Sequence, residues 1–96
     1  MLSAFSKNDK AVFDKLIRYF SSGSYMSELE MRIKKIFPNY TLKDIDSGKV
    51  KLNDTEMAEI PDTMKEIIYE YCVKEGMSKE ATTQVTTYFE QTFLRN

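Results

Sequence analysis

The sequence contains no histidine, the side chain that serves most often as a general base or a metal ligand. Cys72 is its only cysteine, so the chain can form neither an internal disulfide, nor a cysteine-based zinc site, nor a Cys–His nucleophile. The three glycines lie far apart and form no phosphate-binding loop. We therefore expect no catalytic site, no cofactor and no metal ion, and we expect Cys72 to act as a small buried hydrophobic residue.

Other scarcities bear on the compartment. No apolar run approaches the roughly 20 residues that a transmembrane helix needs, so we expect no membrane association. A single cysteine is typical of a reducing compartment, and we expect the protein to be cytoplasmic.

Tight-turn residues are also scarce, with three glycines and two prolines in 96 residues, and tryptophan is missing. A β-sandwich needs many such turns, whereas helices joined by short loops do not. The chain is 42% hydrophobic, which supplies enough apolar side chains for one core. We predict an all-α fold, a single domain over 1–96, formed by a compact bundle of five or six short helices, with at most a short strand pairing near 49–52.

Apolar spacing and capping residues predict where the helices lie. The predicted helices span 8–20, 27–37, 41–46, 54–60, 64–75 and 79–94. Pairs of a polar residue and an acid three positions later predict capping boxes at the starts of three of them, namely Ser27 with Glu30, Thr41 with Asp44, and Asn53 with Glu56.

Glycine and proline are expected to separate these helices. Gly23 is expected to break the chain in a left-handed conformation after the first helix. Pro61 is expected to end one helix and let the next begin.

The apolar stripes of these helices predict the core. Its expected members are Phe13, Leu16, Ile17, Leu29, Ile33, Leu42, Ile45, Ile67, Ile68, Val85 and Phe89, and Ile36 is expected on the same buried face of the second helix.

Charge is distributed unevenly along the chain. Residues 1–52 carry ten Lys or Arg against six Asp or Glu, whereas residues 53–96 carry four against nine. A basic half beside an acidic half fits an anion-binding unit joined to a protein-contact unit, although such a split is only mildly unusual in a small protein.

One segment suggests a family. Leu42 and Ile45, followed by Asp46, Gly48 and Lys49, match the end of the recognition helix in Cro/repressor-like helix-turn-helix proteins. Residues 12–60 resemble that family, with Phe37-Pro38-Asn39-Tyr40 in place of its tight turn. The resemblance implies a small DNA-binding transcriptional regulator of the kind found in phages and mobile elements, with 1–60 as the helix-turn-helix unit.

The same resemblance implies which side chains would contact DNA. At the start of the recognition helix, Asn39, Tyr40, Thr41 and Lys43 would face base edges in the major groove. Around it, Lys34, Lys35, Lys49 and Lys51 would neutralise phosphates.

The second half is similar to the C-terminal helical hairpin that dimerises Sin-type repressors. This similarity implies a homodimer formed through residues 62–96. The expected interface residues are Tyr71, Tyr88, Phe89, Phe93 and Leu94.

A second interpretation needs no DNA. The same helices and the near-zero net charge of −1 fit a helical protein-interaction module, such as an inhibitor, an immunity protein or an antitoxin-like protein. The sequence leaves open whether the partner is DNA or a protein.

Overall fold

A computed structural model describes residues 5–94, and the side chains of residues 5–92 among them. Of the residues that the structure describes, 77% are helical and none lies in a strand, which confirms the predicted all-α class. The order of elements is α1 (Lys7–Ser21), α2 (Ser24–Ile36), α3 (Leu42–Asp46), α4 (Asp54–Lys74), α5 (Lys79–Phe89) and a final π-helical stretch, η1 (Glu90–Leu94). No helix among the described residues is both long enough and apolar enough to cross a bilayer.

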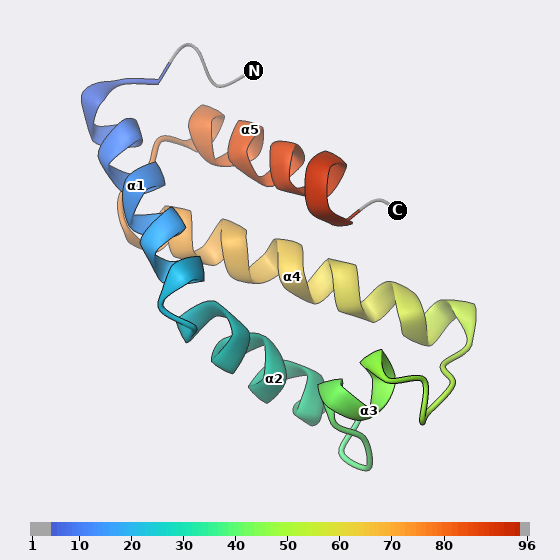
Figure 1. The fold of residues 1–96 in the computed structure, drawn as a ribbon. Helices are drawn as coiled ribbons and strands as arrows, with labels where there is room; N and C mark the ends of the chain where they lie inside the picture. Colours follow the sequence, from blue (N-terminus) through green and yellow to red (C-terminus); the bar gives the residue numbers. More distant parts are fainter. Residues whose placement is uncertain (1–4, 95–96) are drawn as a thin grey trace.

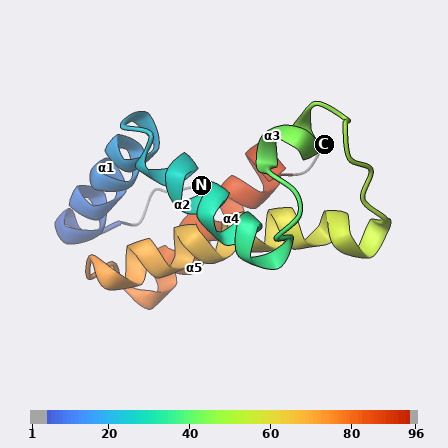
Figure 2. The same cartoon turned by 90° about the horizontal axis from the view of Figure 1, so that it is seen from below.

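The long helix α4 organises the molecule (Figure 1). It lies between α5, its partner in a hairpin, and α2, and it runs antiparallel to both. Helix α1 packs against α2 and α4 at one end, and the short α3 contacts the far end of α2. Seen from below, α1 and α3 therefore lie at opposite ends of α2 (Figure 2).

The core lies where α1, α2, α4 and α5 meet. Its buried apolar residues are Val12, Leu16, Tyr25, Leu29, Ile33, Ile67, Ile68, Cys72, Met77, Ala81, Val85 and Phe89. Cys72 is buried, as its place on an apolar stripe predicted. Burial raises the pKa of its thiol to about 11, so the thiol is protonated at neutral pH and is a poor nucleophile.

Aromatic rings of α1 link the other helices to one another. The Phe20 ring lies 4.5 Å from that of Tyr25 in α2 and 5.1 Å from that of Phe89 in α5. The Tyr19 ring stacks on that of Tyr71 in α4, with centroids 4.4 Å apart. Such ring pairs contribute roughly 0.5–1.5 kcal/mol each beyond their buried area, so α1 fastens three helices together.

A buried carboxylate fastens α1 to the hairpin. Asp9, only 5% exposed, accepts hydrogen bonds from the Ser78 backbone N–H (2.8 Å) and the Ser78 hydroxyl (2.9 Å). Asp9 therefore supplies negative charge at the first turn of α5 from a distant part of the chain. The Ser78 backbone hydrogen bond is the largest of the effects that lower the pKa of Asp9.

Two of the predicted helix boundaries are wrong. Helix α2 begins at Ser24, so Ser27 is an interior residue and does not form a capping box with Glu30. Gly23, at φ 85°, turns the chain within one residue, and α2 can begin immediately after it. The capping boxes at Thr41–Asp44 and Asn53–Glu56 are confirmed.

The second error concerns Pro61, which lies inside a continuous α4 and does not separate two helices. The proline removes one backbone hydrogen bond, but apolar residues on both sides of it, Ile60 and Met64, pack against the core. This packing outweighs the local cost of proline. The hydroxyl of Thr63 also donates to the Glu59 carbonyl at 2.7 Å, a contact that accommodates bending of a helix.

Most of the predicted core is buried or half-buried, with two exceptions. Ile17 is exposed because it lies about 100° around α1 from Leu16, beyond the face that meets α2 and α4. Ile36 is exposed because it is the last residue of α2. Phe13, Leu42 and Ile45 are half-buried and pack against the edge of the core.

Candidate interaction surface on α2 and α3

Some basic side chains of the first half form ion pairs with acidic side chains of the second half inside the fold. Arg32 of α2 contacts Glu70 of α4 through two hydrogen bonds of 2.7 and 3.2 Å, and it also bonds Glu28 at 2.7 Å. Hydrogen bonds to Glu70 and Glu28 raise the pKa of Arg32. Lys15 of α1 pairs with Glu75 at 3.2 Å. The basic first half is thus joined to the acidic hairpin by ion pairs.

Five lysines of the first half are not used in this way. They are Lys34, Lys35, Lys43, Lys49 and Lys51, which we call the lysine surface. All five are exposed, and none takes part in an ion pair of 4.0 Å or less within the described part of the chain.

The fold of α3 brings members of this surface together. Thr41 and Asp44 cap α3 reciprocally, and the Val50 backbone N–H donates to the Asp44 carbonyl at 3.2 Å. Hydrogen bonds from Thr41 are the main cause of the lowered pKa of Asp44, and the charges of Lys49 and Lys34 add to it. Lys34 at the end of α2 and Lys49 after α3 therefore lie near the same carboxylate, although 14 residues separate them in the sequence.

The residues predicted to contact bases lie in or next to the short helix α3, and two of them, Tyr40 and Thr41, already make contacts within the fold. Helix α3 has five residues, about 7.5 Å at 1.5 Å per residue. The hydroxyl of Thr41 accepts from the Asp44 N–H, and the ring of the half-buried Tyr40 lies 6.1 Å from that of Phe37. Asn39 and Lys43 are exposed.

The predicted interface residues of the hairpin do not form one exposed patch. Phe89, predicted at the interface, is only 6% exposed and belongs to the core, where it contacts Phe13 and Phe20 of α1. Tyr71 is half-buried beneath Tyr19, and Tyr88 is exposed. The side chains of Phe93 and Leu94 lie outside those that the structure describes.

Sequence reasoning missed an exposed apolar side chain beside the lysine surface. Met31 of α2 is 47% exposed and lies three and four residues before Lys34 and Lys35, so all three occupy neighbouring positions on the helix surface. The available signal was an apolar residue off the stripe formed by Tyr25, Leu29 and Ile33.

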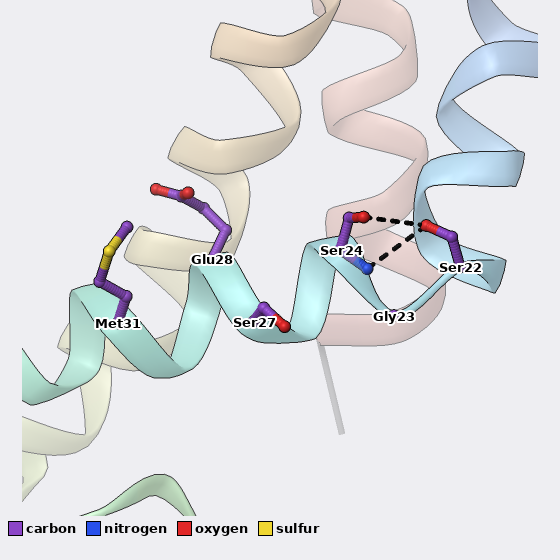
Figure 3. A pocket seen from close by; sticks show the side chains of 6 residues that line it. All are labelled: Ser22, Gly23, Ser24, Ser27, Glu28 and Met31. Atoms are coloured by element: carbon purple, nitrogen blue, oxygen red, sulfur yellow. Dashed lines mark hydrogen bonds between the residues drawn. The ribbon is translucent and has the colours of Figure 1, made fainter.

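A shallow hollow at the start of α2 extends this surface (Figure 3). It is lined by Ser22, Gly23, Ser24, Ser27, Glu28 and Met31. The hydroxyls of Ser22 and Ser24 hydrogen-bond to each other at 3.1 Å, and the Glu28 carboxylate is bonded to Arg32. Ser22, Ser24 and Glu28 of this hollow are therefore already engaged in hydrogen bonds within the fold.

Within residues 5–94, no three His, Cys, Asp or Glu side chains are grouped so that they could hold a metal ion. Comparison with protein families, with curated proteins and with solved structures gives no match to this chain.

Proposed function

We propose that the protein is a helical protein-interaction module that docks on an acidic partner protein through Met31 and the lysine surface. The observation that carries this proposal is the exposed Met31 beside lysines that make no ion pair within the described chain. Protein interfaces commonly combine a few apolar anchors with a polar rim, and complementary charge speeds the encounter and selects the partner.

Two features favour a protein over base-reading in DNA. A helix of about 7.5 Å offers few positions to a major groove that a recognition helix normally enters with its N-terminal residues. The Thr41 hydroxyl is already used as a cap.

DNA binding is the second candidate, because five exposed lysines at one end of the molecule also suit phosphates. In that case, as the resemblance to Cro/repressor-like regulators implies, the protein would regulate transcription. Contacts from Lys49 and Lys51 would then dominate the affinity, with little discrimination between sequences.

Matched charge variants separate the two candidates. The test variant carries Lys34→Gln, Lys35→Gln and Lys49→Gln, and the control carries Lys7→Gln, Lys10→Gln and Lys79→Gln, which removes the same charge from exposed lysines elsewhere. Partners are captured by cross-linking from cells that make the protein, then purified and titrated against each variant by calorimetry.

We expect the test variant to bind the purified partner at least about tenfold more weakly than the control does. A parallel titration uses a mixed-sequence DNA duplex at about 50 mM salt, where phosphate contacts are strong. Saturable DNA binding that the test variant alone loses, with no lysine-dependent protein partner, would favour the second candidate.

A further inference from the structure

The outward face of α4 carries a second row of exposed side chains. Glu59, Asp62, Glu66, Tyr69 and Val73 follow one another at alternating spacings of three and four residues, so they form a line along the helix. The first three are acidic, and the last two are apolar, with Tyr69 42% and Val73 51% exposed. In the described structure no other helix covers this row.

The ion pairs of this row are weak. Glu66 lies 3.5 Å from Arg32, whose shorter contacts go to Glu28 and Glu70. Asp62 lies 3.7 Å from Lys65, which is closer to Glu90 at 3.1 Å. The side chains of Asp62 and Glu66 are each 66% exposed, so pairs of this kind contribute little and leave both carboxylates accessible.

The outward face of α2 carries a row that complements it. Along α2 an apolar residue, Met31, is followed by two bases, Lys34 and Lys35. Along α4 the order is reversed, with acids first and apolar residues last. If α2 of one molecule lies antiparallel to α4 of another, Met31 contacts Tyr69 and Val73, and the two lysines contact Glu66 and Asp62.

The spacing of the two rows agrees with this register. Met31 to Lys35 spans about 6 Å of helix, and the midpoint of Tyr69 and Val73 lies about 7.5 Å from Glu66. The two helices already pack antiparallel inside the monomer, where Arg32 faces Glu66 and Glu70 (Figure 1). The outward rows would repeat that pairing between molecules.

We propose that a second copy of this chain occupies each row: the outward face of α2 in one molecule docks antiparallel on the outward face of α4 in the next. The contact joins two different faces, so association closes at a dimer where two copies pair both faces reciprocally about a two-fold axis, and continues where each added copy leaves one face of each kind free. This inference deepens the proposed function by naming the acidic partner as another copy of the same chain.

Two variants test the pairing by sedimentation velocity. The α2-face variant carries Met31→Ser, Lys34→Gln and Lys35→Gln, and the α4-face variant carries Asp62→Asn, Glu66→Gln, Tyr69→Ser and Val73→Ser. The control carries Lys7→Gln and Lys10→Gln, and circular dichroism establishes that each variant is folded. Protein is studied from about 10 to 500 μM at about 50 mM salt, where charge complementarity is little screened.

We expect the mass of the wild type and the control to rise with concentration to that of a dimer or beyond, while each face variant stays monomeric. An equimolar mixture of the two variants should stop at twice the monomer mass, because one intact face of each kind is present and no third molecule can add. A wild type that stays monomeric would overturn the inference, as would a mixture that stays monomeric.

The outcome separates this inference from the proposed function. If the wild type is monomeric but a different acidic protein binds it in a manner that depends on Lys34 and Lys35, the proposed function stands and the second copy is excluded as the partner. If self-association occurs and no other partner depends on these lysines, the second copy is the partner.

Discussion

Replacing Ile33 by alanine should be one of the most costly single changes to the fold. The Ile33 side chain is 0% exposed and lies on the face of α2 that packs against α4. The substitution removes three carbon atoms, worth about 0.8 kcal/mol each in lost transfer free energy, and leaves a cavity between two helices. We expect the free energy of unfolding to fall by about 3–4 kcal/mol, a large part of the roughly 5–10 kcal/mol typical of such a domain.

A matched substitution supplies the control. Ile45 of α3 is half-buried at the edge of the core, so Ile45→Ala should cost about 1–2 kcal/mol, because fewer of the same atoms are taken out of an apolar environment. Urea unfolding followed by circular dichroism at 222 nm measures both values. A loss of less than about 1 kcal/mol for Ile33→Ala, or one no larger than that for Ile45→Ala, would refute the described packing of α2 on α4.

Three further predictions concern polar groups and the backbone. The hydroxyl of Thr82 is buried with no hydrogen-bond partner among the described residues, so Thr82→Val should stabilise the protein by about 1 kcal/mol. Thr86→Val should not stabilise it, because that change removes a 2.8 Å hydrogen bond to the Thr82 carbonyl. Equal effects of the two substitutions in urea unfolding would contradict this reasoning. The pKa of Asp9 lies below its ordinary value of 3.8 in the folded state, so its contribution to stability is present above that pH and is lost as the pH falls through the lower, folded value. Asp9→Asn should therefore flatten the acid limb of a plot of stability against pH, and an unchanged limb would argue against the contact with Ser78. Gly23→Ala should lower the free energy of unfolding by about 1 kcal/mol, because alanine is strained in the left-handed backbone conformation of this residue. No atom lies within 4 Å of the added carbon, so no steric clash adds to this cost. An unchanged melting temperature would argue against the left-handed conformation.

Local signals predicted much of the helix pattern. Thr41–Asp44 and Asn53–Glu56 satisfy free backbone groups from within a few residues, so they can be recognised in the sequence. Ser27 and Glu30 form the same pattern but lie inside α2, because Gly23 allowed the helix to begin earlier. Pro61 was misjudged for a related reason: packing of α4 on its neighbours overrides a local preference.

Contacts between distant segments were beyond sequence reasoning. Nothing in the spacing of residues indicates that Arg32 meets Glu70, or that Asp9 caps α5 through Ser78. The sequence identified the lysines as candidates for anion binding, but the approach of Lys34 and Lys49 to the same carboxylate, that of Asp44, depends on the path of the chain around α3. Met31 was overlooked because its exposure, in contrast to the burial of the apolar stripe of α2, depends on how α2 packs against its neighbours.

The most direct test of the proposed interaction surface is lysine footprinting by mass spectrometry. The protein is acetylated briefly, alone and in extract from cells that make it, with and without nuclease. Lys34 and Lys35, with others of the lysine surface, should be protected in extract and remain protected after nuclease treatment, while Lys7, Lys10 and Lys79 react equally in all samples. Protection that nuclease abolishes would assign the surface to nucleic acid, and protection confined to the control lysines would contradict the account.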